Sequence, residues 1–157
     1  MEPADAELLL AVGEPALLSL AERPPSAPVL PIASGGRAHA VARAGLASAL
    51  EAVVDGAYRS ARHPILALEI DGSEVARAVT DAMLITAEPA RISEYGVETD
   101  AGNAERFRAD GVVVATPLGS DGYAGAAGGP TIETGVGLSV VPISPFSTHA
   151  RTWVSSP

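Results

Sequence analysis

The pattern of apolar residues changes its character near Arg59, and this change limits the fold of the chain more than any other feature of its sequence. Before this point, apolar runs at Leu8–Gly13 and Val29–Ile32 are each followed by a stretch with helical character, which predicts the order β-α-β-α. Such an order is typical of a parallel sheet with helices on its faces. After this point, short runs separated by turn residues predict strands. We therefore expect an α/β lobe over residues 1–58 and a β-rich lobe over residues 59–157.

Two helices are expected in the first lobe. The first covers Pro15–Glu22 and carries proline in its first turn, where proline is tolerated. The second runs from about Ala38 to Val54, because its leucines and valines fall near one face at helical spacing. Gly56 is placed to end this second helix.

The second lobe is expected to be built mainly from strands. The dipeptide Asp71-Gly72 is a strong signal for a two-residue hairpin turn between two of them. The expected strands cover Leu66–Ile70, a partner that begins at Glu74, Ala82–Thr86, Arg91–Val97, Glu105–Arg108, Val112–Ala115 and Leu138–Ile143.

Composition and charge exclude several classes of protein. The 157 residues include 19 acidic and 10 basic residues, and the formal net charge of -9 argues against nucleic acid or an anionic membrane as a partner. The absence of cysteine excludes disulfides, thiolate metal sites and cysteine nucleophiles. All ten basic residues are arginine, so there is no lysine for a Walker A loop or a Schiff base. The sequence shows no signal peptide or membrane-spanning run, and we expect a cytoplasmic protein.

The segment Gly119–Gly129 is the most unusual part of the sequence, because glycine stands at positions 119, 122, 125, 128 and 129. A flexible linker is one interpretation of this composition. A glycine turn with a purely structural role is a second. The third is a loop whose backbone N–H groups approach a ligand, and the strand expected just before it argues against a simple linker.

The residues around this segment resemble the signature of the NAD kinase family. Asp110–Pro130 reads DGVVVATPLGSDGYAGAAGGP, and the family signature runs Asp-Gly, a strand, Thr-Pro-x-Gly-Ser-x-x-Tyr, small residues and Gly-Gly-Pro. Pro142–Pro145 is similar to the Pro-Ile-x-Pro end of a family strand, and Ser147 and Arg151 fit the Ser-x-x-x-Arg that follows it. So many fixed residue types at matching spacing make the resemblance specific.

The resemblance extends upstream over nearly the whole chain. Pro28–Gly35 resembles the family's Pro-Val-Leu-Gly-Ile-Asn-Thr-Gly, and Leu8–Leu18 stands where the family has Gly-Gly-Asp-Gly-Thr-x-Leu. Thr80-Asp81 stands at the place of Asn-Glu or Asn-Asp. The chain is nevertheless short for the family at both ends. The implied fold is a truncated α/β lobe with a parallel sheet, followed by the family's β-rich lobe.

The resemblance also implies an activity. Members of this family transfer the γ-phosphoryl group of ATP, or a phosphoryl group of polyphosphate, to the 2′-hydroxyl of the adenosine ribose of NAD, which gives NADP. Such a transfer needs a positioned nucleophile, a base and Mg²⁺ to neutralise the phosphates. The implied partners are therefore NAD, ATP or another phosphoryl donor, and Mg²⁺. The sequence leaves a homo-oligomer open.

The resemblance assigns roles residue by residue. Glu14 stands at the place of the family's catalytic aspartate and is the implied base. The implied NAD-binding residues are Gly13, Thr80, Asp81, Arg108, Asp110, Asp121, Gly122, Tyr123 and Ala126. Simpler roles stay open for some of them: an acid at a helix N-terminus for Glu14, a turn residue for Asp110, and a core or rim aromatic for Tyr123.

No protein metal ligands are expected from the residues themselves. His39, His63 and His149 are the three histidines, and their spacing fits no metal-ligand pattern. We therefore interpret all three as ordinary histidines.

The phosphate side of the implied site departs from the family pattern. Val12 and Pro15 replace glycines of the Gly-Gly-Asp-Gly motif, Glu14 is one methylene longer than aspartate, and Ala33 replaces an asparagine. Pro15 also removes a backbone N–H. Three interpretations follow: an NAD kinase of reduced rate, a weak or inactive relative that binds NAD or NADP as a regulatory module, and a fragment completed by a partner subunit.

Overall fold

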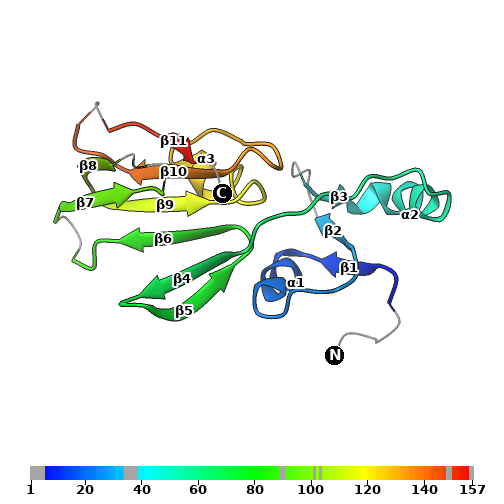
Figure 1. The fold of residues 1–157 in the computed structure, drawn as a ribbon. Coiled ribbons are helices and arrows are strands. Elements are labelled where there is room, and N and C mark those ends of the chain that lie inside the picture. Colours follow the sequence, from blue (N-terminus) through cyan, green and yellow to red (C-terminus); the bar gives the residue numbers. More distant parts are fainter. Residues whose placement is uncertain are drawn as a thin grey trace.

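The computed structural model describes residues 6–33, 39–88, 91–100, 102, 104–147 and 150–155, and these form an α/β lobe followed by a β-rich lobe (Figure 1). The α/β lobe consists of β1 (Leu9–Val12), α1 (Glu14–Leu18), a 3₁₀ turn (Ser19–Ala21), β2 (Val29–Ala33), β3 (Val41–Ala42), a second 3₁₀ turn (Arg43–Gly45) and α2 (Leu46–Val54). No helix in the described residues is long and apolar enough to cross a membrane.

The sheet of the α/β lobe is parallel, in the order β1-β2-β3. Leu9 lies opposite Val29 and Val12 opposite Ile32, so the carboxyl ends of β1 and β2 meet at the same edge. The Gly13 N–H donates to the Ile32 carbonyl at 2.9 Å and extends this ladder by one residue. The parallel sheet predicted from the β-α-β-α order is confirmed.

The second predicted helix was wrong in its first part. The α-helix begins only at Leu46, and Val41 and Ala42 instead form β3, which pairs with Ile32 and Ala33. Pairing with β2 outweighs the local helical pattern here, and the β-branched Val41 suits a strand. Residues 34–38, which include the predicted first residue Ala38, lie outside the described part of the chain.

The end of α2 is confirmed at Gly56. This glycine has a φ of +69°, which favours glycine because a side chain would be strained there. The Gly56 N–H donates to the Val53 carbonyl at 3.1 Å, and the Ala57 N–H donates to the Ala52 carbonyl at 2.7 Å. This pair of bonds is the Schellman motif, which satisfies carbonyl groups at a helix end.

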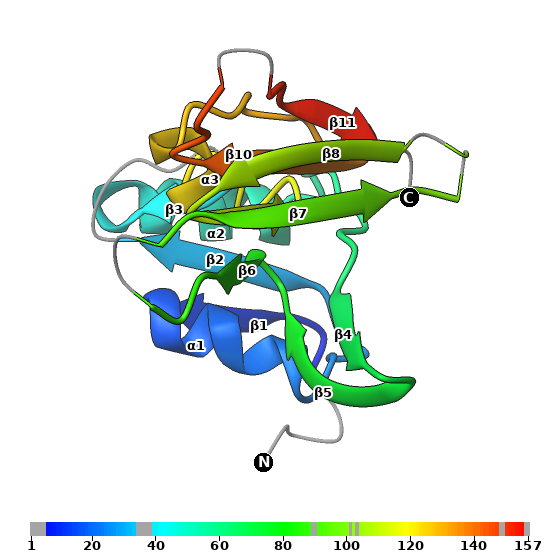
Figure 2. The ribbon, with the colours of Figure 1, turned by 90° about the vertical axis from the view of Figure 1, so that its left-hand side faces the viewer.

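The β-rich lobe combines one larger sheet with two hairpins. Its elements are β4 (Leu66–Ile70), β5 (Ser73–Ala78), β6 (Asp81–Ile85), β7 (Ser93–Glu98), β8 (Ala104–Ala109), β9 (Gly111–Ala115), α3 (Tyr123–Ala126), β10 (Leu138–Ile143) and β11 (Trp153–Ser155). The larger sheet is antiparallel in the order β11-β10-β9-β6, while β4-β5 and β7-β8 pair separately. Figure 2 shows the β7-β8 hairpin on one side of the lobe, and Figure 1 shows the β4-β5 hairpin beside β6.

Local sequence signals place most of these strands. The turn between β4 and β5 has positive φ at both Asp71 and Gly72, as a type I′ turn requires, so the predicted hairpin is confirmed. Two elements had no prediction. These are the short helix α3 inside the glycine-rich segment and the strand β11, whose Trp153 packs edge-on against Phe107 with ring centroids 6.2 Å apart.

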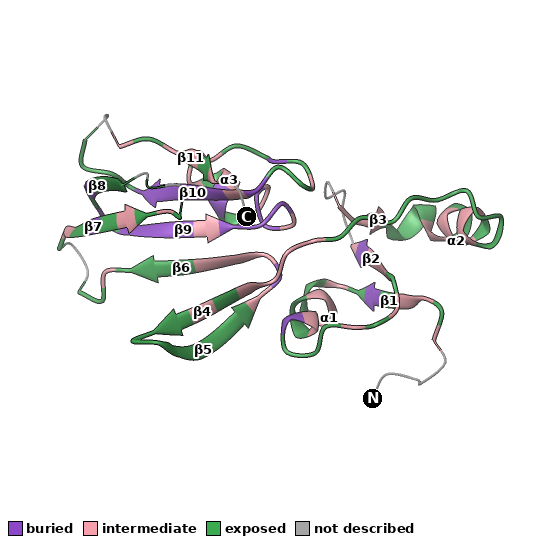
Figure 3. Ribbon diagram, in the orientation of Figure 1, coloured by how far each residue is buried: buried purple, intermediate pink, exposed green. Residues whose placement is uncertain are grey.

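The core lies mainly on the two faces of β9 and β10 (Figure 3). On one face Val113, Ala115, Val141 and Ile143 pack with Ala124 of α3. On the other face Val112 and Val140 pack with residues of the β7-β8 hairpin. By contrast, α2 has no fully buried residue, and β6 exposes Met83, Leu84 and Ile85 at the edge of the sheet.

Candidate functional site

A cleft lies between the two lobes, where the carboxyl ends of β1 and β2 face the start of β6 and the glycine-rich segment. Its lining includes the predicted residues Gly13, Glu14, Thr80 and Asp121, together with Ala33. The sequence separates these residues by up to about a hundred positions, and the fold brings them together. The enclosed volume is about 50 Å³, which admits a hydroxyl or phosphoryl group but not a nucleotide, whose remainder must lie outside.

The α/β lobe contributes the turn from β1 into α1. Gly13 has a φ of +80°, a conformation that permits the chain to leave the sheet sharply and that strains any other residue. Glu14 follows as the exposed acid in the first turn of the five-residue helix α1, with Pro15 next to it. The Gly13 N–H already donates to Ile32, and Pro15 has no N–H, so neither group can reach a phosphate as a donor.

The β-rich lobe contributes Thr80 and Asp81 at the start of β6. Asp81 is partly buried, and this burial raises the pKa of its carboxyl above the ordinary value. The negative charge of Glu14 raises the same pKa further. Because Glu14 acts on Asp81 across the cleft, the two carboxyl groups belong to one electrostatic environment.

The glycine-rich segment is fixed against the start of β6. The Thr116 N–H donates to the Thr80 carbonyl at 2.8 Å, and the Thr116 hydroxyl donates to the Val79 carbonyl at 2.7 Å. A Cβ on Gly119 would overlap the backbone carbonyl group of Thr80. Glycine is therefore required at this position by the close approach of two backbone segments.

A second set of bonds closes the segment on itself. The fully buried Ser120 hydroxyl donates to the Pro117 carbonyl at 2.9 Å and accepts from the Ile132 N–H at 3.0 Å. A Cβ on Gly129 would overlap the Val141 side chain and the Ala124 carbonyl. The flexible-linker interpretation is wrong for this segment, because its backbone and hydroxyl groups hold it in the core.

Among the predicted residues of the segment, only Asp121 lines the cleft. Asp121 lines it directly, and Gly122 precedes the first residue of α3. Tyr123 is 47% exposed, which rules out a core role and leaves a rim role, and Ala126 is also exposed. The structure thus presents Asp121 to the cleft and Tyr123 to solvent.

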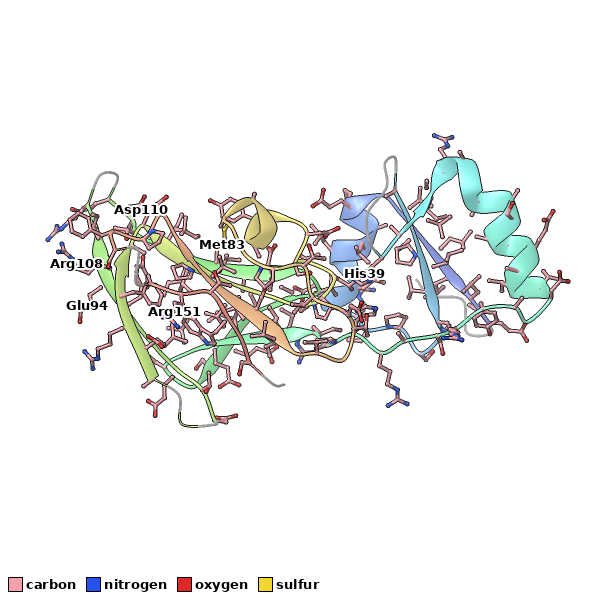
Figure 4. All side chains as sticks on the ribbon, turned by 90° about the horizontal axis from the view of Figure 1, so that it is seen from above. His39, Met83, Glu94, Arg108, Asp110 and Arg151 are labelled. Carbon is pink, nitrogen blue, oxygen red and sulfur yellow. The ribbon has the colours of Figure 1, made fainter. Side chains whose placement is uncertain are left out.

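Arg108 and Asp110 do not lie at this cleft. They stand at the other end of β9, near Thr86 and Phe146, where the Arg108 guanidinium lies 5.3 Å from the Phe146 ring centre. Asp110 and Thr116 are separated by about 20 Å of extended chain at ~3.3 Å per residue. Figure 4 shows both residues at the far end of the β-rich lobe, well away from His39.

Several cleft-lining residues had no site prediction from the sequence, and Leu17, His39 and Leu118 are among them. Leu17 is one turn beyond Glu14 on α1, so its position follows once the helix is known. No sequence pattern marks His39. Its place in the cleft depends on how the chain returns from β2 to β3, which is a tertiary feature.

The charge of the cleft is unusual for a phosphate site. Glu14 and Asp121 line it and Asp81 lies close to Glu14, while no arginine is found among the lining residues that the structure describes. His39 is the one basic side chain in that lining. A triphosphate in this cleft therefore needs cations to offset the repulsion between its charges and these carboxylates.

Known proteins are similar to this chain in sequence and in fold. Residues 79–157 match the family model of the ATP-NAD kinase C-terminal domain. The chain is 37% identical over 117 residues to the NAD kinase of Methanopyrus kandleri and 39% identical over 85 residues to that of Methanospirillum hungatei. The chain belongs to the NAD kinase family.

The match to these family members is partial in length. It covers 74% of this chain and 42% of the Methanopyrus kandleri NAD kinase, and 54% of this chain and 32% of the Methanospirillum hungatei one. The chain thus spans less than half the length of these relatives.

Solved NAD kinase structures share the fold over almost the entire chain. A crystal structure of an NAD kinase from Archaeoglobus fulgidus in complex with ATP superposes with a TM-score of 0.75 at 24% identity, and covers 96% of this chain and 61% of its own. Yeast NADH kinase complexed with NADH gives a TM-score of 0.74 at 23% identity, covering 96% of this chain and 48% of its own. The predicted NAD kinase-like fold is confirmed.

Proposed function

We propose that the chain binds NAD and a phosphoryl donor at the cleft between its lobes and transfers a phosphoryl group to the 2′-hydroxyl of NAD at a low rate. The observation that carries this proposal is the meeting of Gly13, Glu14, Thr80 and Asp121 in one cleft. Family resemblance implied these residues from three separate parts of the sequence, because Gly13 and Glu14 are neighbours while Thr80 and Asp121 lie far from them and from each other. The structures of relatives bound to ATP and to NADH support nucleotides as ligands.

In this proposal Glu14 removes the proton from the ribose hydroxyl. Its carboxylate is exposed at the cleft, so it is accessible to a substrate. A general base typically contributes about 10²–10⁴-fold to a rate, while positioning and charge stabilisation carry most of a phosphoryl transfer. Asp81 would accept a hydrogen bond from a ribose hydroxyl at the start of β6.

Mg²⁺ is the metal that such a transfer uses to neutralise the donor phosphates. The Asp121 carboxylate would supply oxygen ligands of the type that Mg²⁺ prefers, usually from one or two carboxylates per ion with phosphate oxygens completing the set. The absence of arginine from the described lining makes this neutralisation more important than in a basic site. The residues present therefore fit the ion.

A specific observation favours the alternative function, an NAD- or NADP-binding module with weak or no catalysis. The Gly13 N–H is engaged by Ile32, Pro15 has none, and α1 has only five residues, so the loop offers few donors for a triphosphate. The NAD side keeps Asp81 and the anchored glycine-rich segment. Such a module is expected to bind NAD but to have lost the binding of ATP or another phosphoryl donor.

The deciding experiment is to measure NADP formation from NAD and ATP with Mg²⁺, together with NAD binding by calorimetry. We expect measurable NAD binding and slow NADP formation that falls further in Glu14→Gln. Glu98→Gln, an exposed acid on β7, serves as the matched control and should change neither. Binding without any turnover supports the module, and no binding of NAD or NADP contradicts both functions.

Restoring the loop tests why the rate is low. The triple change Val12→Gly, Glu14→Asp and Pro15→Gly should raise the rate more than Glu14→Asp alone, because it also returns the backbone N–H that Pro15 lacks and removes the side-chain bulk of Val12. All three side chains are exposed, so the fold should tolerate the change. If the wild-type protein forms NADP as fast as a kinase with an intact Gly-Gly-Asp-Gly motif, this explanation is contradicted.

We also propose that the chain works as a homo-oligomer. Its accessible surface is 10433 Å², whereas a compact monomer of this mass exposes about 7,300 Å². Arg108 and Asp110, far from the cleft in one chain, can take part in NAD binding if a second copy brings them to it. Light scattering at several concentrations tests the assembly, and Arg108→Ala should weaken NAD binding only if the assembly forms.

A further inference from the structure

Two histidines that are distant in sequence meet behind the cleft. His39 lies between β2 and β3, and His63 lies in the segment that leads from α2 to β4. Their ring centroids are 5.4 Å apart, with the ring planes inclined by 73°. Both line a second groove of about 830 Å³, bordered by residues 24–31 and 58–65, and His39 also lines the candidate cleft.

Each ring carries a buried nitrogen for which the described residues supply no hydrogen-bond partner. The Nε2 atom of His39 and the Nδ1 atom of His63 are inaccessible to solvent and have no hydrogen-bond partner within the described residues. Unsatisfied buried polar atoms are uncommon in folded proteins, and a bound ion is one established reason for them. Two of them on neighbouring rings point to a shared ligand.

The surroundings of His63 resemble those of a metal ligand. Its Nε2 atom lies 3.4 Å from the Thr134 hydroxyl oxygen. When Nε2 donates its proton to this oxygen, Nδ1 carries the lone pair. Metal-binding histidines typically use one nitrogen in this way and coordinate through the other. Thr134 belongs to the loop after the glycine-rich segment, so three separate parts of the chain meet here.

The spacing of the rings suits a common metal ion. With metal–nitrogen distances of about 2.1 Å and a tetrahedral angle, two imidazole centroids lie about 5.2 Å apart. The observed 5.4 Å is close to this value. The groove provides an entry path and room for water ligands to complete the coordination.

We propose that His39 and His63 form a binding site for a divalent transition-metal ion of the Zn²⁺ class, with Thr134 orienting His63. Imidazole nitrogen suits Zn²⁺, Cu²⁺ and Ni²⁺, whereas Mg²⁺ prefers oxygen ligands, so this site is chemically distinct from the Mg²⁺ of phosphoryl transfer. The described part of the chain has no cluster of three or more His, Cys, Asp or Glu side chains that could hold a metal, so its described residues supply two ligands to this site. The inference does not rest on the proposed kinase activity.

The test is a calorimetric titration of the full chain, freed of metal by a chelator and desalted, with ZnCl₂ and separately with MgCl₂. One equivalent of Zn²⁺ should bind and raise the Tm. Mg²⁺ should not compete with Zn²⁺ for the site at His39 and His63. His39→Ala and His63→Ala should each weaken Zn²⁺ binding by more than about tenfold, since even outer-sphere partners commonly account for about 10–100-fold. Thr134→Val should weaken it less.

His149→Ala is the matched control, because it removes the third histidine of the chain and should leave the Zn²⁺ affinity unchanged. His39→Gln and His63→Gln replace the alanine variants if those fail to fold, as judged by circular dichroism without metal. With Co²⁺ in place of Zn²⁺, the wild type should show visible absorption bands that both histidine variants lose. Absence of Zn²⁺ binding, equal binding to the variants, or an equal loss in His149→Ala would each overturn the proposal.

Discussion

The glycine-rich segment of the β-rich lobe and the turn at Val12–Ala16, between β1 and α1, differ in how far their packing requires glycine. In the first, Gly119 and Gly129 leave no space for a Cβ, because other parts of the chain lie against them. In the second, Val12 and Pro15 stand where the family has glycine, and both are exposed, Val12 to 65%. Packing therefore requires glycine at Gly119 and Gly129, whereas Val12 and Pro15 are exposed, so packing does not decide the residue type there.

The largest expected effect tests whether packing requires glycine at position 119. Gly119→Ala should destabilise the protein by about 3 kcal/mol or more, because the added Cβ overlaps the Thr80 backbone, which cannot move without shifting β6. Urea unfolding measures the change. Gly96→Ala is the control, since a Cβ there has no neighbour within 4 Å and should cost little. Equal stability of the two variants would show that Gly119 is not required by packing.

A smaller effect is expected at the bond that anchors the segment. Thr116→Val keeps the side-chain shape but leaves the buried Val79 carbonyl without its 2.7 Å hydroxyl bond, which should cost about 1–3 kcal/mol. The loss should also weaken NAD binding, because Thr80 and Asp81 follow Val79 directly. Thr131→Val, at an exposed position, should change neither quantity. If the Thr116→Val variant is destabilised but binds NAD with unchanged affinity, the hydrogen bond from Thr116 to Val79 does not contribute to NAD binding.

The pH dependence of stability tests the electrostatic interaction between Asp81 of the β-rich lobe and Glu14 of the α/β lobe. Its raised pKa means that protonated Asp81 is favoured in the folded state, so its contribution to stability is full below the unfolded pKa of about 3.9 and is lost as pH rises through the folded pKa. Asp81→Asn should therefore raise the Tm at pH 7 and leave it nearly unchanged at pH 3. Glu14→Gln should lower the pKa of Asp81, measured by NMR titration. A Tm difference independent of pH would contradict this account.

The smallest expected effect concerns the surface as a whole. The chain has 19 acidic against 10 basic residues, and the described ion pairs, Arg77–Glu74, Arg91–Glu88 and Arg106–Glu94, are all exposed. Salt screens the remaining repulsion, so the Tm should rise with added NaCl, by about 2–4 °C for each kcal/mol gained. A Tm that stays flat up to molar salt would show that the acidic excess does not limit stability.

Sequence reasoning succeeded where the signal was local. The Asp71-Gly72 turn, the Gly56 helix end and the buried strand β9 each depend on residues that are neighbours in the chain. It failed at Val41, where pairing with β2 produced a strand inside a predicted helix. It also had no prediction for β11, because a three-residue strand at the edge of a sheet carries too little pattern to be recognised.

The sequence by itself determined the change from an α/β lobe to a β-rich lobe, most of the strands, and membership of the NAD kinase family through the spacing of the Asp110–Pro130 motif. Only the tertiary structure decided which of the implied site residues meet. The antiparallel register of β6 and β9 places Asp81 beside Ala115 and carries Asp110 to the opposite end of the sheet. Contacts such as His39 with His63 depend on how separate segments pack, and no local pattern in the chain encodes that distance.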